Sequence, residues 1–164
     1  MKIKTLFLAF GLIFVLATAL DAQDYKTAVG GKLGYGLIGS YKTFLNEKAA
    51  IDAFAGLRWG GLAAGVYYLN HTPIESVERL QWYWGAGPIL TTWNYGVFFG
   101  GSYTRLGLSG VIGLDYSIED VPLNISIDWA PTLVVYDNIN KAYGITSGRF
   151  ISGFGAVSVR YILN

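Results

Sequence analysis

The feature that most constrains this chain is a strict alternation between large apolar and polar side chains from Leu123 to Trp129. A period of two is typical of a β-strand whose two faces meet different surroundings. Similar alternation recurs over residues 51–59, 106–118 and 151–163, whereas no stretch after the first 22 residues shows helical periodicity. The pattern therefore predicts an all-β protein.

Short polar or glycine-rich turns divide the chain into eight predicted strands. The turns at 46–48, 60–61 and 119–122 are short, the connection 71–79 is the most polar, and 93–103 and 136–149 are longer loops. No composition shift marks a second domain, so residues 23–164 are interpreted as one domain. The predicted strands are 27–35, 38–45, 49–59, 62–70, 80–92, 104–117, 123–135 and 150–162.

The first 22 residues have the three-part pattern of a secretory signal peptide. A basic start, with Lys2 and Lys4, precedes an uncharged run from Thr5 to Leu20, and the sequence turns polar at Asp21. We place cleavage after Ala22, with cleavage after Ala19 as the alternative. An uncleaved membrane anchor is disfavoured because a helical span needs about 20 apolar residues.

The composition excludes several classes of protein. Charged residues are 14% of the chain, against roughly 25% in ordinary globular domains. The net charge of +1 provides no basic field for DNA or RNA, so no nucleic-acid partner is expected. The chain has no cysteine and one histidine, which excludes a disulfide scaffold, a Cys nucleophile and a multi-His metal site. We therefore expect no cofactor and no metal.

The two faces of the predicted strands indicate which solvent each one meets. The face opposite the large apolar residues carries Gly, Ala and Ser beside a few charges, as the narrow interior of a membrane barrel requires. Aromatic residues gather near predicted strand ends, as in the girdles of membrane barrels. The predicted inward charges are Lys32, Asp52, Arg58, Arg105, Asp115, Asp128 and Arg160. The predicted girdle is Tyr35, Trp59, Tyr67, Tyr68, Trp82, Tyr83, Trp84, Trp93, Tyr95, Tyr116, Trp129, Tyr136 and Tyr161.

These patterns predict a closed, antiparallel, up-and-down transmembrane β-barrel of eight strands, inserted in a bacterial outer membrane after export. An even number of strands puts both mature termini on the periplasmic side, and the turns near 35–37 and 60–61 then leave one wall of the barrel low. Pro88 and Pro131 lie inside predicted strands, so we expect bulges or strand ends there. Phe54, Val111 and Phe154 are large residues that fall on the polar face.

The sequence offers little chemistry, and no residue is predicted to be catalytic. The inward charges are interpreted as a structural, paired network, because an unpaired buried charge is costly; a proton path or a catalytic group is the alternative. His71 and Thr72 with Glu75 or Ser76 are the candidate residues for a hydrolase arrangement, and a polar turn is the alternative. Phe98 and Phe99 form an exposed apolar pair in the loop 93–103, which either contacts a partner or lipid or folds over the barrel mouth.

Six stretches of the chain carry a family resemblance: 40–51, 56–61, 82–87, 110–116, 121–131 and 155–161. They resemble the small eight-stranded outer-membrane β-barrel proteins of Bacteroidota-type bacteria. The resemblance covers most of the mature chain and implies the barrel fold and the outer-membrane location, but no activity or catalytic residue. One departure is the ending Ile162-Leu163-Asn164, where a terminal aromatic is the commoner insertion signal.

The leading functional hypothesis is a non-enzymatic outer-membrane barrel with a plugged, charge-paired lumen and a structural, adhesive or accessory role. Its expected partners are outer-membrane lipid, lipopolysaccharide and other outer-membrane proteins. The alternatives are a lipid-modifying enzyme of the lipid A deacylase or acyltransferase type, a small pore, and a soluble lipocalin-like binder in the periplasm.

Overall fold

The computed structural model describes residues 25–34, 36–58, 60–94, 102–138, 149–153 and 155–163. The predicted signal peptide and the residues Tyr35, Trp59, Tyr95, Phe98, Phe99 and Phe154 lie outside these ranges. In the described part of the chain, no helix is long and apolar enough to cross a membrane. The strands, in chain order, are β1 (Thr27–Leu33), β2 (Gly36–Phe44), β3 (Ala49–Arg58), β4 (Gly61–Pro73), β5 (Leu80–Asn94), β6 (Ser102–Ser117), β7 (Leu123–Trp129), β8 (Thr132–Asp137), β9 (Phe150–Ile151) and β10 (Gly155–Leu163).

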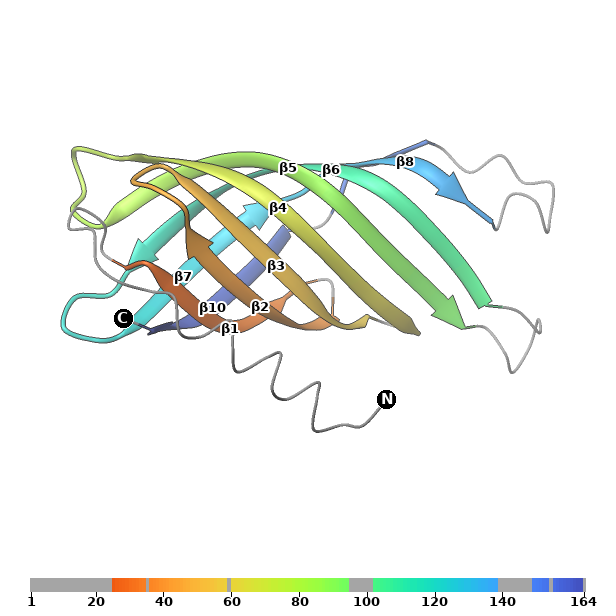
Figure 1. Ribbon diagram of the computed structural model, residues 1–164, viewed down its shortest axis with the longest axis horizontal. Helices are drawn as coiled ribbons and strands as arrows, with labels where there is room; N and C mark the ends of the chain where they lie inside the picture. The colour runs from red at the N-terminus through yellow and green to blue at the C-terminus, as the bar shows by residue number, and fades with distance from the viewer. Residues whose placement is uncertain are drawn as a thin grey trace.

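The strands form a closed antiparallel barrel (Figure 1). Each of β1 to β6 pairs with the next strand, β7 pairs with both β6 and β10, and β10 pairs with β1 to close the ring. β8 continues the line of β7 along β6, and β9 precedes β10, so the ten segments build eight barrel strands in up-and-down order. The predicted closed, antiparallel, up-and-down barrel of eight strands is confirmed.

The cross-strand register fixes the tilt of the strands. Followed through successive partners around the barrel, the path from Leu106 on β6 returns to β6 at Tyr116, ten residues away. A shift of ten residues around eight strands gives a tilt of about 41° from the barrel axis, for a rise of about 3.3 Å per residue and a strand spacing of about 4.8 Å. The path runs through Leu90, Ala64, Ala55, Gly39, Gly31, Val159 and Ile125.

The two ends of the barrel differ. The short turns 45–48, 74–79 and 118–122 lie at one end. The paired residues Thr27 and Leu163 lie there too, so the first strand starts and the last strand finishes at this end. We call this the turn end and the opposite one the loop end. β5 and β6 have 15 and 16 residues against 7 in β1, and in Figure 1 they extend with β8 beyond the other strands at the loop end. The wall formed by β1 to β3 is low, as predicted.

The two prolines behave differently. Pro131 separates β7 from β8, but its carbonyl accepts a 3.0 Å hydrogen bond from the Gly110 N–H, so the line of the strand continues. At Pro88 the expected bulge is absent, since the register between β4 and β5 is the same on both sides of it. Only the pairs that Val66 and Tyr67 would form there are missing, because a proline has no N–H to donate. The predicted strands 123–135 and 150–162 are each interrupted once.

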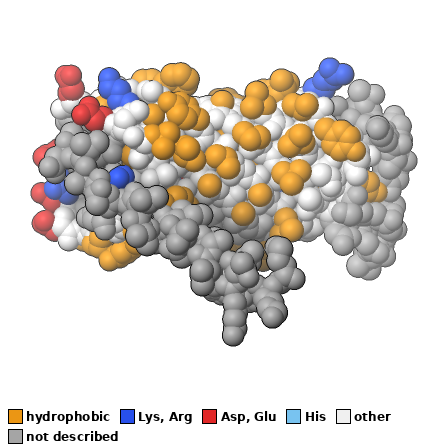
Figure 2. Space-filling model, in the orientation of Figure 1, with side chains coloured by type: hydrophobic (Ala, Val, Ile, Leu, Met, Phe, Trp, Pro, Cys, Tyr) orange, Lys and Arg blue, Asp and Glu red, His pale blue; other side chains and the backbone are white. Residues whose placement is uncertain are grey.

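The apolar face lies outside, as the alternation predicts. Along β7, Ile125, Ile127 and Trp129 are exposed, while Asn124, Ser126 and Asp128 are buried in the lumen. Figure 2 shows hydrophobic side chains over the middle of the barrel and charged side chains toward its ends. Phe54 and Val111, the described exceptions to the pattern, are buried inside. Tyr67, Tyr83 and Trp93 are corrections to the predicted girdle. Tyr67 and Tyr83 are buried in the lumen, and Trp93 contacts the inward arginines Arg58 and Arg105, whereas Tyr68, Trp82 and Trp84 face outward.

Candidate functional site

The centre of the lumen holds four of the seven predicted inward charges. The Lys32 Nζ lies 3.0 Å from Asp52 Oδ2 and 3.1 Å from Asp128 Oδ2, and the Arg160 Nη2 lies 3.0 Å from the same Asp52 oxygen. All four side chains are at most 3% exposed. These residues come from β1, β3, β7 and β10, and the closure of the barrel brings them together.

Hydroxyl groups provide further hydrogen bonds to this central cluster, although Asp128 Oδ1 has no hydrogen-bond partner among the described residues. Ser40 donates to Asp52 Oδ1 at 2.7 Å, and Tyr83 donates to Asp128 Oδ2 at 3.1 Å. Arg160 donates from Nε to Ser40 and from Nη1 to Ser126, at 2.9 and 2.8 Å. Hydrogen bonds of this kind offset part of the cost of burying the charges.

Asp115, also predicted to face inward, lies in a second cluster nearer the turn end. It accepts hydrogen bonds from Lys42, from Tyr25 at 3.2 Å and from Asn124 at 2.6 Å. Lys42 is 1% exposed, and the rings of Tyr25, Phe44 and Tyr83 surround its ammonium at 5.0 to 5.8 Å. Sequence reasoning missed Lys42, although it lies two residues from Ser40 and so shares the inward face.

The two clusters balance in charge. Lys32, Lys42 and Arg160 supply three positive charges, and Asp52, Asp115 and Asp128 supply three negative ones. The two clusters together therefore carry no net charge, which is the arrangement that a low-dielectric environment favours. The network is suited to filling and rigidifying the barrel.

Arg58 and Arg105, the other two predicted inward charges, lie apart from the central cluster, at the loop end. Both guanidinium carbons lie 4.9 Å from the centroid of a ring of Trp93. Arg105 also pairs with Asp137 of β8, with its Nη2 2.7 Å from Oδ2. The seven predicted residues thus belong to three levels of the lumen rather than to one network.

His71 does not assemble a hydrolase site in the described structure. Its side chain is fully buried between the rings of Phe44 and Tyr83, at 4.8 and 5.0 Å, and neither ring nitrogen makes a hydrogen bond. Glu75 is exposed in the following turn. A general base must reach the group that it activates, and here aromatic rings occupy the faces of the imidazole. Among the described residues, no group of three or more His, Asp or Glu is placed to hold a metal ion.

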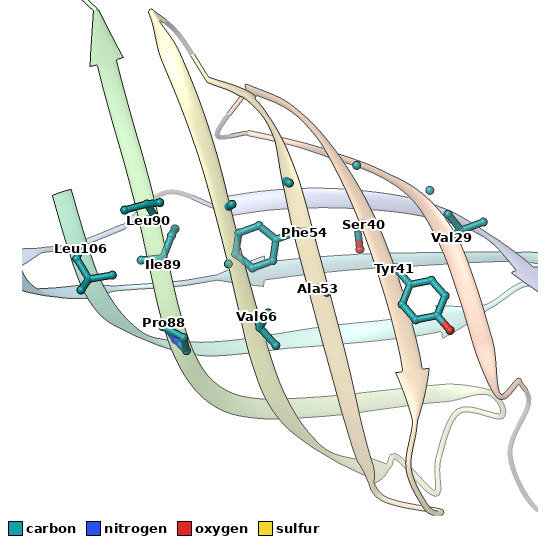
Figure 3. Close-up of a pocket in the computed structure, with 15 residues that line it drawn as sticks. Val29, Ser40, Tyr41, Ala53, Phe54, Val66, Pro88, Ile89, Leu90 and Leu106 are labelled. Carbon is teal, nitrogen blue, oxygen red and sulfur yellow. The ribbon is translucent and has the colours of Figure 1, made fainter. Parts of the chain in front are cut away.

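A groove of about 710 Å³ lies on the outer wall of the barrel (Figure 3). Its base consists of small residues on adjacent strands, since Gly39 pairs with Ala55 and Ala55 pairs with Ala64. Two residues further toward the loop end, four leucines form a ridge. The groove belongs to the apolar outer surface, and its two hydroxyl residues are Tyr41 and Ser40, whose hydroxyl binds Asp52 in the lumen. The ridge is Leu33, Leu37, Leu57 and Leu62.

Comparisons of the chain with protein-family models, with curated proteins and with solved structures find no match. The class of protein is therefore defined by the fold itself, a closed eight-stranded antiparallel β-barrel with an apolar outer surface and an ionic interior.

Proposed function

We propose that this protein is an integral outer-membrane β-barrel with a plugged, charge-paired lumen and a structural, adhesive or accessory role rather than a catalytic one. The observation that carries the proposal is the inversion of the two faces. Ile127, Leu108 and Val157 are 46 to 55% exposed on the outside of the barrel, while Arg160, Lys42 and Asp52 are 1 to 2% exposed inside it.

The inversion has a simple physical reason in a bilayer. Leaving a large apolar side chain in water forgoes roughly 1.5–3 kcal/mol per residue, and the outer wall carries such residues on every barrel strand. Acyl chains are the solvent in which this surface is stable, and closure of the sheet leaves no backbone group unpaired at a lipid-facing edge.

The charges at the two ends support an orientation with the termini in the periplasm. The short turns carry Glu47, Glu75, Glu78, Glu119 and Asp120 against Lys48 and Arg79, so the turn end is acidic. The described loop end carries Arg58, Arg105 and Arg149 against Asp137. A basic end suits the outer leaflet, where the phosphates of lipopolysaccharide are anionic, and we propose lipopolysaccharide and outer-membrane lipid as its surroundings.

Lumen packing favours a plug over a pore. The central and turn-end clusters come from strands all around the barrel, and their side chains are almost completely buried. In an eight-stranded barrel the interior is just wide enough for side chains to fill it.

Membrane fractionation tests the proposal. The full chain, expressed with its N-terminal segment in a Gram-negative host, is expected to sediment with the outer membrane, to resist a carbonate wash, and to migrate differently on gels before and after boiling. Recovery in the soluble fraction without detergent would refute the membrane location. Stable conductance steps in planar bilayers would replace the plug with a pore.

A further inference from the structure

The loop-end mouth of the lumen gathers cationic and hydroxyl groups around one small cavity. The cavity is about 30 Å³ in volume, and its polar lining is Arg58, Thr91, Arg105 and Thr132. The rest of the lining is apolar side chains and glycines. A volume of this size accommodates one or two water-sized oxygens.

Trp93 is a common contact of the two arginines. Both guanidinium carbons lie 4.9 Å from the centroid of a ring of Trp93, and the planar groups thus share one aromatic support. Two like charges that face the same ring repel each other, and a bound anion between or above them relieves the repulsion.

The mouth has more positive than negative charge. The described residues at this end include three arginines, Arg58, Arg105 and the rim residue Arg149, and one carboxylate, Asp137, whose Oδ2 lies 2.7 Å from Arg105 Nη2. No Asp or Glu occurs between Asp137 and the C-terminus or between residues 79 and 115. The excess of positive charge is therefore a property of the sequence at this end, however the individual side chains are paired.

Guanidinium groups and hydroxyls are the donors that recognise phosphate oxygens, since the planar fork of arginine matches two of them at once. We propose that the loop-end mouth is a binding site for a phosphate group, with one oxygen in the cavity near Thr91 and Thr132 and the others facing Arg58 and Arg105. The chemistry fits either a free phosphate or the phosphate of a lipid headgroup. The residues of the barrel interior form the site whether or not the barrel lies in a membrane. Only access to the site from the outer leaflet rests on the proposed function.

Calorimetric titration of the folded mature barrel tests the site. The protein is refolded in octyl glucoside, a phosphate-free detergent, and titrated with inorganic phosphate. In parallel it is titrated with micelles that contain a diphosphoryl glycolipid or the same glycolipid after dephosphorylation. Saturable binding of inorganic phosphate supports a free ligand, and binding of only the diphosphoryl glycolipid supports a headgroup.

The variants are Arg58→Gln, Arg105→Gln and the double variant, with Arg79→Gln at the turn end as a matched control. Each single loss is expected to weaken phosphate binding about tenfold, a loss of about 1.4 kcal/mol, and the double variant is expected to abolish it. Arg79→Gln is expected to leave binding unchanged. Arg58→Gln keeps the Arg105–Asp137 pair, so it remains informative if Arg105→Gln does not fold, and heat-modifiable migration verifies folding.

Binding of neither probe by the wild-type barrel would overturn the site, as would undiminished binding by folded Arg58→Gln or an equal loss in Arg79→Gln. These results are independent of fractionation. A soluble chain that binds phosphate at these arginines would refute the membrane location alone, and a membrane-integrated chain that binds no phosphate would refute the site alone.

Discussion

The Lys42–Asp115 pair provides a quantitative test of the interior. Lys42→Met leaves the Asp115 carboxylate, 2% exposed, with only the neutral donors of Tyr25 and Asn124. Asp115→Asn leaves the ammonium of Lys42, 1% exposed, without its carboxylate. Breaking a buried ion pair from one side costs about 3–5 kcal/mol, so each single variant is expected to lower the folding equilibrium constant by roughly two to three and a half orders of magnitude.

The double variant separates the charge effect from the loss of packing. Lys42→Met with Asp115→Asn keeps the lumen neutral, nearly preserves both side-chain volumes, and retains an amide oxygen for Tyr25. Replacing both partners of a buried pair is often close to neutral, so the double variant is expected to cost less than either single one. The coupling energy of the cycle should then exceed about 3 kcal/mol in favour of the pair.

The measurement is a urea titration of each variant in phospholipid vesicles, followed by tryptophan emission, with gel migration of unboiled samples as a second probe of folding. A Lys42→Met cost below about 1 kcal/mol would refute the reasoning. A double-variant cost equal to the sum of the single costs would also refute it, because the two side chains would then act independently.

Two further predictions concern the wall of the barrel. A Cβ on Gly30 would lie 2.0 Å from the Val159 carbonyl oxygen, whereas a Cβ on Gly31 would meet nothing closer than 3.8 Å. Gly30→Ala is therefore expected to prevent closure of β1 on β10 and to abolish heat-modifiable migration, and Gly31→Ala is expected to preserve that migration. Equal behaviour of the two variants would count against the close approach of β1 to β10 at Gly30. Ile127→Arg places a charge on the outer surface of β7 and is expected to lower the free energy of unfolding in vesicles by about 2–4 kcal/mol. Val77→Arg in the turn 74–79 is expected to lower it little. An Ile127→Arg barrel as stable as the Val77→Arg barrel would show that Ile127 does not face acyl chains.

Much of the barrel is predictable from the sequence because the period of a strand assigns each side chain to a face. The alternation in 123–129 placed Asp128 inside and Ile127 outside, and the same parity applied to Lys42 would have placed it inside. The errors in the girdle have the same origin. Tyr67 and Tyr68 are adjacent and cannot both face the bilayer, and of the three aromatics from Trp82 to Trp84 the central Tyr83 must point inward.

Which inward side chains meet is not readable from the strands taken singly, because it depends on the register between them. Arg160 reaches Asp52 across 108 residues of sequence, and Lys42 reaches Asp115 across 73. A shear of ten residues around the barrel decides that Arg160 lies level with Asp52 and that Lys42 lies level with Asp115 nearer the turn end. It also decides that Arg58 and Arg105 lie at a third level, near the loop end. Pattern alone assigned all seven predicted charges to one set, whereas the geometry divides them.

The register is in turn fixed by the residues that it brings together. A slip of β1 by two residues along β10 keeps every side chain on its face, so the alternation cannot prevent it. Such a slip moves Lys32 or Ala28 into the place of Gly30, where any Cβ lies 2.0 Å from the Val159 carbonyl oxygen. It also removes the Lys32 ammonium from Asp52 and Asp128, so that the buried Asp128 carboxylate loses the cation that pairs with it. A glycine that admits no side chain and an ion pair that admits no displacement thus select one register among those that the hydrophobic pattern allows.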